Sequence, residues 1–233
     1  MLSETLYGSR LETREYDAEN RMTRAASNGG AQQNYYVYDG DGRRVRRIVG
    51  GEETWQVYGI DGELLAEYKL VTGAPEATPS KEYGYRNGQL LIVGDKAESK
   101  VWWLVTDHLG TPRIEVDQTG SLGSVKRHDY LPFGEEVTVG VGTGSIRTVG
   151  IGYGVSTVRQ RLGSKERDIE TGLDYFGARY YSSTMGRWLI PDWSEAPEPV
   201  PHSDLTNPQS LNLYTYVSNN PVSKFIGKKN LTS

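Results

Sequence analysis

Carboxylates in the last third of this chain are the residues whose types and spacing could do chemistry. Asp168, Glu170 and Asp174 are separated pairwise by two, four and six residues, and Asp192 directly follows Ile190-Pro191. Two carboxylates that lie close together can share a proton, so that one acts as a base and the other as an acid. The spacings of the first three do not define a glycosidase pair, and their loop context favours solvation or turn capping. On chemistry alone, Asp192 caps a turn after a strand.

Other catalytic and ligand patterns are weak. The histidines His108, His128 and His202 fall in unlike contexts without metal-ligand spacing, so no metal or cofactor is predicted. Asp39-Gly-Asp41-Gly42 resembles part of a calcium loop but lacks the distal Glu, which favours a hairpin turn. Gly140-Val-Gly-Thr-Gly144 lacks the Lys-Ser/Thr of a phosphate loop and is interpreted as linker. No serine-hydrolase elbow is present.

Composition favours a β protein. The 233 residues include 16 Tyr and 28 Gly, which suit a curved sheet with tight turns better than a helical bundle. The net charge is −4, so no global basic field attracts nucleic acid. The run Arg43-Arg44-Val45-Arg46-Arg47 is interpreted as arginines on a solvated strand.

Some localisation signals are missing from this sequence. It contains no Cys, which excludes disulfides and thiol zinc sites. No apolar run approaches the ~18 residues of a membrane span. Met1-Leu2-Ser3-Glu4 lacks the basic and apolar regions of a signal peptide.

The first half of the chain repeats loosely at intervals of roughly 20–27 residues, as stacked supersecondary repeats do. Tyr16-Asp17, Tyr38-Asp39 and Tyr58-Gly59 each precede a turn, in which Asp is expected to bind backbone amides. Short runs beside the turns predict strands over 34–38, 54–58, 64–70 and 101–106. Each unit is therefore predicted to be a β-hairpin that pairs edge to edge with its neighbours, with Tyr and Trp on one face of a continuous curved sheet.

The last third predicts a compact end. Strands over Leu173–Tyr181 and Arg187–Ile190 are expected to pair around Ser182–Gly186, and Ala196–His202 to form a crossing loop because of its prolines. One short helix is predicted near 210–218, capped by Ser210 or Asn212. This end is expected to bury five aromatic residues: Tyr175, Phe176, Tyr180, Trp188 and Tyr214.

Three ordered blocks carry a family resemblance. They are Lys165–Tyr181 (KERDIETGLDYFGARYY), Gly186–Asp192 (GRWLIPD), and the pair Asn212–Tyr216 (NLYTY) with Asn219–Pro221 (NNP). Their order and spacing resemble the RHS repeat-associated core of RHS/YD-repeat proteins, and the upstream Tyr-Asp units resemble YD repeats. Trp102–Arg113 and Asp129–Gly134 resemble the blocks that open this core.

The resemblance implies the fold and the division of the chain. It implies a mainly β chain in which stacked β-hairpins form a spiral sheet, the C-terminal part of an RHS shell. Residues 1–100 would be YD-type hairpin repeats, 101–226 the RHS repeat-associated core, and 227–233 a divergent tail.

The resemblance also implies a self-cleavage site. In this family two aspartates form an intramolecular aspartic protease that releases a C-terminal segment. Asp192 matches the first aspartate, but Ile226 stands where the second belongs, and no carboxylate lies between Val222 and Ser233. Asp192 is therefore interpreted as vestigial, with Asp204 and Asp174 as the alternative partners.

The predicted function is a structural encapsulation module without catalytic turnover. The chain would be a fragment or remnant of a secreted, surface or toxin-delivery polypeptide, and its partners would be a C-terminal payload or the remaining shell repeats. Two alternatives stay open: an autoprotease that uses Asp192, and cell-wall or carbohydrate binding through exposed Tyr and Trp. A secreted or cell-surface location follows from the resemblance alone.

Overall fold

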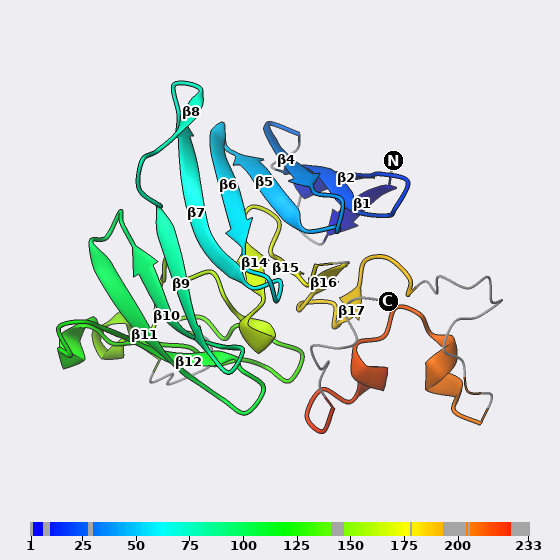
Figure 1. The fold of residues 1–233 in the computed structure, drawn as a ribbon. Helices are drawn as coiled ribbons and strands as arrows, with labels where there is room; N and C mark the ends of the chain where they lie inside the picture. The colour runs from blue at the N-terminus through cyan, green and yellow to red at the C-terminus, as the bar shows by residue number, and fades with distance from the viewer. Residues whose placement is uncertain are drawn as a thin grey trace.

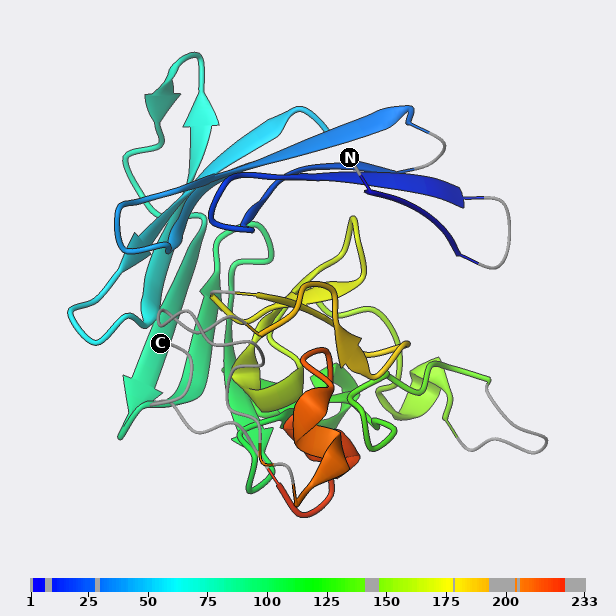
Figure 2. The same ribbon diagram turned by 90° about the vertical axis from the view of Figure 1, so that its right-hand side faces the viewer.

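A long antiparallel sheet curves around a second, smaller sheet in the computed structural model (Figure 1). The structure describes residues 2–6, 10–27, 30–140, 147–177, 179–192, 204 and 206–224. Viewed from the side, the second sheet (residues 166–188, yellow) lies inside the hollow of the first (Figure 2). The predicted mainly β fold built from stacked hairpins is confirmed.

The large sheet follows the chain almost strand by strand. Only β8 leaves this order, because it pairs with β7 alone. The strands are β1 (Leu2–Leu6), β2 (Arg10–Tyr16), β3 (Met22–Ser27), β4 (Gln32–Tyr38), β5 (Arg44–Val49), β6 (Glu52–Tyr58), β7 (Leu64–Val71), β8 (Ala74–Pro75), β9 (Lys81–Arg86), β10 (Gln89–Asp95), β11 (Lys100–Thr106), β12 (Pro112–Asp117) and β13 (Lys126–Arg127). All four strands predicted in the first half are present.

One five-residue turn recurs along the chain. The first residue's N–H donates to the fifth residue's carbonyl, and the fourth residue's N–H donates back to the first carbonyl. Its fourth position has a positive φ each time, from 59° to 84°, which favours Gly or Asn. The turn is found at 17–21, 39–43, 59–63, 107–111, 131–135 and 161–165.

The Tyr-Asp pair has two separate tasks in this turn. Asp39 Oδ1 accepts the amides of Asp41 (3.0 Å) and Arg43 (2.8 Å), so the side chain organises the turn as predicted. The hydroxyl of Tyr38 donates to the carbonyl of Met22, in the preceding hairpin, at 2.7 Å. The aspartate thus shapes its own hairpin, and the tyrosine joins it to the previous one.

The second sheet lies within the curve of the first. It consists of β14 (Glu166–Asp168), β15 (Leu173–Tyr175), β16 (Tyr180–Ser182) and β17 (Arg187–Trp188). The prediction of one strand over Leu173–Tyr181 is wrong, because a turn closed by Phe176 N–H and Arg179 O (3.0 Å) divides it into β15 and β16. The predicted pairing around Ser182–Gly186 is present between β16 and β17.

The helical segments of the described ranges are short 3-10 turns. They are η1 (Leu122–Ser124), η2 (Val149–Ile151), η3 (Leu162–Ser164), η4 (Pro208–Leu211) and η5 (Val217–Asn219). The single helix predicted near 210–218 is wrong. Asn207 caps η4, and positive φ angles at Val217, Ser218 and Asn219 prevent a continuous helix. No helix in the described part of the chain has the length and apolar character needed to cross a membrane.

An aromatic cluster forms the compact end of the domain. Trp188 is 2% exposed and lies edge-on to Phe176, with ring centroids 5.1 Å apart. Tyr216 packs on Tyr181 at 4.5 Å and completes the cluster. The predicted burial of Tyr214 is wrong, because its side chain is 39% exposed and Tyr216 points inward instead. The expected crossing loop, Ala196–His202, lies outside the described residues.

Tyr and Trp lie on both faces of the large sheet, so the prediction of one aromatic face is wrong. On β6, Trp55 and Val57 face outward, whereas Thr54 and Gln56 are buried on the concave face. Strand β11 instead buries apolar side chains and leaves Trp103 51% exposed. The concave face is therefore polar along β4–β7 and apolar along β9–β11.

Candidate functional site

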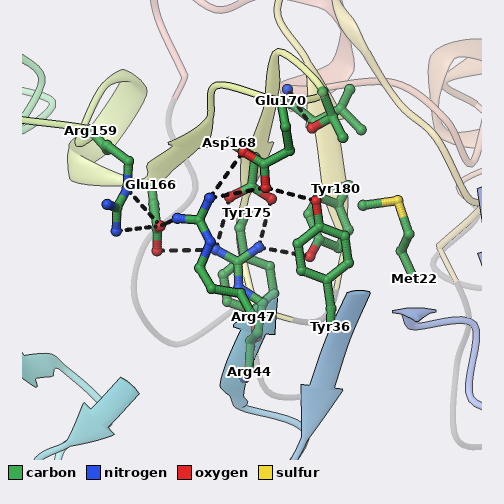
Figure 3. A network of polar contacts seen from close by, with 12 residues as sticks. Met22, Tyr36, Arg44, Arg47, Arg159, Glu166, Asp168, Glu170, Tyr175 and Tyr180 are labelled. Atoms are coloured by element: carbon green, nitrogen blue, oxygen red, sulfur yellow. Dashed lines mark hydrogen bonds and ion pairs between the residues drawn. The ribbon is translucent and has the colours of Figure 1, made fainter. Parts of the chain in front are cut away.

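Ionised side chains meet where the polar part of the concave face contacts the C-terminal segment (Figure 3). We call this set the charge seam. Its arginines are Arg44 and Arg47, on β5, and Arg159, which precedes β14. Its carboxylates are Glu166 and Asp168, on β14, and Glu170, which follows β14. Three guanidinium groups thus face three carboxylates across the interior.

A register shift directs both β5 arginines inward. Tyr38 pairs with Arg44 while Val37 pairs with Arg46, so Val45 is left without a partner in β4. Such a bulge changes the alternation of side chains, and residues three apart then share a face. Arg44 and Arg47 consequently point into the curve, and Arg46 points outward to Glu53.

Arg44 is the most enclosed member of the seam, with no exposed side-chain surface. Its Nη1 and Nη2 donate to the two oxygens of Asp168 at 2.6 and 2.9 Å, a bidentate arrangement. Nη2 also lies 3.1 Å from Glu166 Oε2, and Nη1 donates to the Tyr180 hydroxyl at 3.0 Å. Every terminal nitrogen of this guanidinium group therefore has a carboxylate partner.

Arg47 continues the seam along β5. Its Nη1 donates to Glu166 Oε1 at 2.8 Å, and its Nη2 donates to both oxygens of Glu170 at 2.9–3.0 Å. The hydroxyl of Tyr36, on the adjacent strand β4, donates to Glu170 at 2.8 Å. Glu170 is thus held by two strands of the large sheet.

Arg159 closes the other end of the seam. It lies 2.8 Å from Glu166 Oε1 and also contacts Glu67, on β7. Gln56 donates to Glu166 at 3.0 Å and to Glu67 at 3.3 Å. Strands β5 and β6 therefore reach the Glu166 carboxylate directly, and β7 reaches the C-terminal segment through Arg159.

Tyrosine rings wall off this charge from solvent. The Arg44 guanidinium lies 4.5 Å from the ring centre of Tyr175 and 5.1 Å from that of Tyr36. Both distances are within the range of cation–π attraction. Tyr175 and Tyr180 pack on each other at 5.3 Å, so the charges lie beside packed aromatic rings.

The two β14 carboxylates titrate in opposite directions. Burial favours the neutral form of Glu166, but the guanidinium groups of Arg159, Arg44 and Arg47 outweigh it and hold its pKa well below the usual range. Burial raises the pKa of Asp168 to about 6, helped by the nearby charge of Glu170 and opposed by Arg44. Glu166 is therefore the permanently charged member of the pair.

The seam corrects two interpretations made from the sequence. Arg44 and Arg47 do not lie on a solvated strand, because they are 0% and 6% exposed. Asp168, Glu170 and Asp174 are not solvated loop carboxylates either. Asp168 and Asp174 are 0% exposed, and the Glu170 side chain is 2% exposed. Arg167 holds Asp174 through two hydrogen bonds of 2.9 and 2.8 Å.

The structure places Asp192 apart from this seam. Its carboxylate lies 2.9 Å from Arg179 Nη2, and its side chain is 40% exposed. Its amide donates to the carbonyl of Leu213 at 3.0 Å, which anchors the segment after β17 to the NLYTY block. Arg179 also lies 4.2 Å from the Trp188 ring centre. Asp192 is thus joined to the aromatic cluster through one arginine.

The alternative partners of Asp192 have other partners of their own. Asp204 Oδ1 accepts the Thr206 amide at 2.9 Å and its hydroxyl at 2.6 Å. Asp174 is bound to Arg167. Among the described residues, no carboxylate makes a hydrogen bond with Asp192; Ile226 and the 227–233 tail lie outside them.

The geometry supports structural stabilisation more than catalysis. Each seam carboxylate is held by guanidinium groups, which leaves none of them free to act as a base toward a substrate. In the described ranges, no group of three or more Asp, Glu or His is placed to hold a metal ion. The seam joins two segments that are more than a hundred residues apart in the sequence.

Fold and seam together define a curved β-shell section closed by its own C-terminal segment. The Teneurin YD-shell family model matches residues 76–222, and the chain belongs to this family.

Known proteins of similar sequence and structure include toxins and teneurins. Toxin subunit YenC1 of Yersinia entomophaga is 28% identical over 215 residues, which cover 91% of this chain and 18% of that protein. Mouse Teneurin-3 is 25% identical over 213 residues, covering 90% of this chain and 7% of that protein. A solved structure of the Photorhabdus luminescens Tc holotoxin pore superposes with a TM-score of 0.62 at 20% identity, covering 95% of this chain and 10% of that one. The chain thus spans less than a fifth of the length of these relatives.

Proposed function

We propose that this chain is the closing section of a YD-shell and encapsulates a polypeptide segment without catalysing a reaction. The charge seam is the observation that carries this proposal. Arg44, Arg47 and Glu67 are buried against the C-terminal segment, and that segment supplies their partners Glu166, Asp168 and Arg159, so the two surfaces match in charge. This match of charges supports a concave face that is closed by the C-terminal segment.

Protection of an attached peptide tests the proposal. A trypsin-sensitive peptide is placed after Ser233 in the longest natural polypeptide that contains this chain, and its cleavage rate is compared with that of the same peptide on an unrelated β protein. We expect cleavage to be about tenfold slower or more, because protease access requires the shell to open. Equal cleavage rates would contradict encapsulation.

The partners and location belong to the same proposal. We propose that the chain works as part of a longer polypeptide, because it spans only 18% of the toxin subunit and 7% of the teneurin. Its partners would be a C-terminal payload and further shell repeats, and its location the cell surface or the exterior. We keep the boundary between repeats and core near residue 101.

Self-cleavage is the enzymatic alternative, and the position of Asp192 favours it. We nevertheless propose that Asp192 is vestigial in this chain. Its carboxylate contacts Arg179, and the position of the second catalytic aspartate holds Ile226. A lone carboxylate lacks the partner that separates acid from base. Purified chain should keep its intact mass for days at pH 5 and pH 7. A fragment that accumulates with time and is abolished by Asp192→Asn would overturn this assignment.

Glycan binding is a second alternative, favoured by the outward-facing indole of Trp103, which is 51% exposed. An aromatic ring on an open face can stack on a sugar ring. The Trp55 ring is less available, because Arg46 lies 5.9 Å from its centre. Cell-wall polysaccharide that quenches the fluorescence of the natural chain but not of Trp103→Ala would support this alternative. Equal quenching in both would contradict it.

A further inference from the structure

A buried histidine lies between two glutamates at the far end of the large sheet. His128 directly follows β13 and is 2% exposed. Its Nε2 lies 2.8 Å from Oε1 of Glu115, on β12, and its Nδ1 lies 2.6 Å from Oε1 of Glu136. Glu136 pairs with Tyr130 across the turn at 131–135, so the imidazole joins the sheet to this turn.

The remaining carboxylate oxygens fix the protonation of this group. Ser156 Oγ donates to Glu115 Oε2 at 2.6 Å, and Arg161 Nε donates to Glu136 Oε2 at 3.0 Å. Both Oε2 atoms are therefore acceptors, as they are in ionised carboxylates, and an ionised Oε1 facing each ring nitrogen would also need a donor. A neutral imidazole has only one N–H, so it can satisfy one glutamate but not both. The arrangement is complete only with an imidazolium ion.

The surrounding charges favour that ion on balance. Burial alone would lower the pKa of His128, but hydrogen bonds to Glu115 and Glu136 outweigh it and raise the pKa, against the opposing charge of Arg161. Tyr130 stacks on the imidazole at 6.3 Å and carries Arg113 on its ring at 5.1 Å.

The charged groups that lie beyond Tyr130 and Glu136 are paired with each other. Arg167 faces Tyr130 and Glu136 and is held by Asp174. Asp174 also adds its negative charge near Glu136.

The turn held by His128 reaches the aromatic cluster. The carbonyl of Phe133 accepts the Tyr181 hydroxyl at 2.9 Å, and the carbonyl of Gly134 accepts Arg167 Nη2 at 2.9 Å. Phe133 also packs against the cluster of Trp188 and Tyr216. Movement of this turn would therefore loosen the packing around β16 and β17.

We propose that His128 is a pH-sensitive latch. As an imidazolium ion it ties the 131–135 turn, and through it the aromatic cluster, to β12. When it loses its proton, one ring nitrogen presents a lone pair to a carboxylate, and the turn separates from the sheet edge. The latch is closed at acidic and neutral pH and opens as the pH rises.

The direction follows from proton linkage. A histidine whose pKa is higher in the folded state than in the unfolded chain stabilises the fold fully below its ordinary pKa of about 6.5. That contribution is lost as the pH rises through the folded-state pKa. It is a local effect at the 131–135 turn and does not depend on encapsulation.

Two measurements on the natural chain test the latch. NMR titration of the three histidines, assigned with His→Gln variants, should give His128 a pKa above its ordinary value. Amide exchange, corrected for intrinsic rates, should show the protection of Leu131, Gly134 and Val137 falling about tenfold or more between pH 6 and pH 9. The equivalent amides Asp39 and Gly42, in the same kind of turn without a histidine, should not change.

Glu136→Gln is the matched variant. Its amide can donate to Nδ1 of a neutral imidazole while its carbonyl still accepts from Arg161, so the turn should stay closed at both pH values. Glu53→Gln, at the outward pair with Arg46, should leave the pH dependence unchanged. An ordinary or lowered pKa for His128, or an undiminished pH dependence in Glu136→Gln, would overturn the proposal.

Discussion

Arg44 has several buried partners, so the loss of unfolding free energy on its replacement depends on which carboxylates are left without a partner. Arg44→Met leaves Asp168 without its bidentate partner, and we expect a loss of ~3–5 kcal/mol of unfolding free energy. Asp168→Asn should cost less, because Glu166 still binds Arg44. In urea unfolding, the loss of unfolding free energy in the double variant should be smaller than the sum of the two single losses, by about 1 kcal/mol or more.

The outward-facing, half-buried pair of Arg46 and Glu53 provides the control for this cycle. It has similar geometry, with an N–O distance of 2.6 Å, but lies on the outer face. Arg46→Ala should lower the urea midpoint much less than Arg44→Met does, because the side chains of this pair are 34% and 18% exposed and solvent screens them. Strict additivity of Arg44→Met and Asp168→Asn would show that the two side chains do not stabilise each other.

Trp188 is the largest member of the aromatic cluster, and its loss should be felt strongly. It is 2% exposed and contacts three other aromatic rings within 6 Å. Trp188→Ala should cost ~3–5 kcal/mol in urea unfolding, because it removes buried apolar surface and leaves a cavity. Tyr214→Ala, at a 39% exposed position, should cost less than about 1 kcal/mol. Equal losses would contradict the assignment of Trp188 to the core.

At the scale of the element, the recurring turn is the unit on which the sheet is built. Asp39→Ala removes the acceptor of two backbone amides, and we expect it to cost ~1–2 kcal/mol by urea unfolding. Asp41→Ala, two residues further on, removes only an exposed carboxylate 3.7 Å from Arg43 and should be nearly neutral. If both substitutions had the same effect, the aspartate would not organise the turn.

The sequence predicts the hairpins of the large sheet well because each hairpin contains its own turn-forming residues. Asn87-Gly88 takes the positive φ angles of 52° and 73° that this dipeptide favours, and β4, β6, β7 and β11 lie where the short runs beside the turns placed them. Local turn chemistry needs no knowledge of distant partners. The turn closed by Phe176 and Arg179 lies inside a tyrosine-rich run without an Asn-Gly or Asp-Gly dipeptide, and it was not predicted from the sequence.

The charge seam could not be predicted in the same way. Strand β6 alternates Thr54 and Gln56 with Trp55 and Val57, and simple amphipathic reasoning would bury the apolar pair. The concave face is instead polar because its partner is a charged segment more than a hundred residues away. A run of four arginines and the ERDIE segment were the only signals, and their pairing depends on the bulge at Val45.

At the scale of the whole molecule, buried carboxylates set the acid limit of stability. The guanidinium of Arg161 and the imidazole of His128 overcome the effect of burial and lower the pKa of Glu136 from 4.5 to about 2. A carboxyl with a lowered folded-state pKa stabilises the fold above its unfolded value, and this contribution is lost as the pH falls from 4.5 toward 2. The pKa of Glu166 is lowered too and acts in the same direction.

Asp168 works in the opposite sense. Because its pKa is raised to about 6, its contribution grows as the pH falls from 6 to 3.8. The net loss should therefore develop below about pH 4, measured as a falling urea midpoint. Glu136→Gln should flatten the decline, and an unchanged acid limb in that variant would contradict the assignment.

Cooperation between the large sheet and the C-terminal segment is the central claim, and hydrogen exchange tests it most directly. The amides of β14 and β15 should be protected to about the same degree as those of β5 and β6, because the charge seam makes them open together. In Arg44→Met, protection of all four strands should fall in parallel. Rapid exchange of β14 and β15 in the unmodified chain, while β5 and β6 stay protected, would show that the C-terminal segment does not close the sheet.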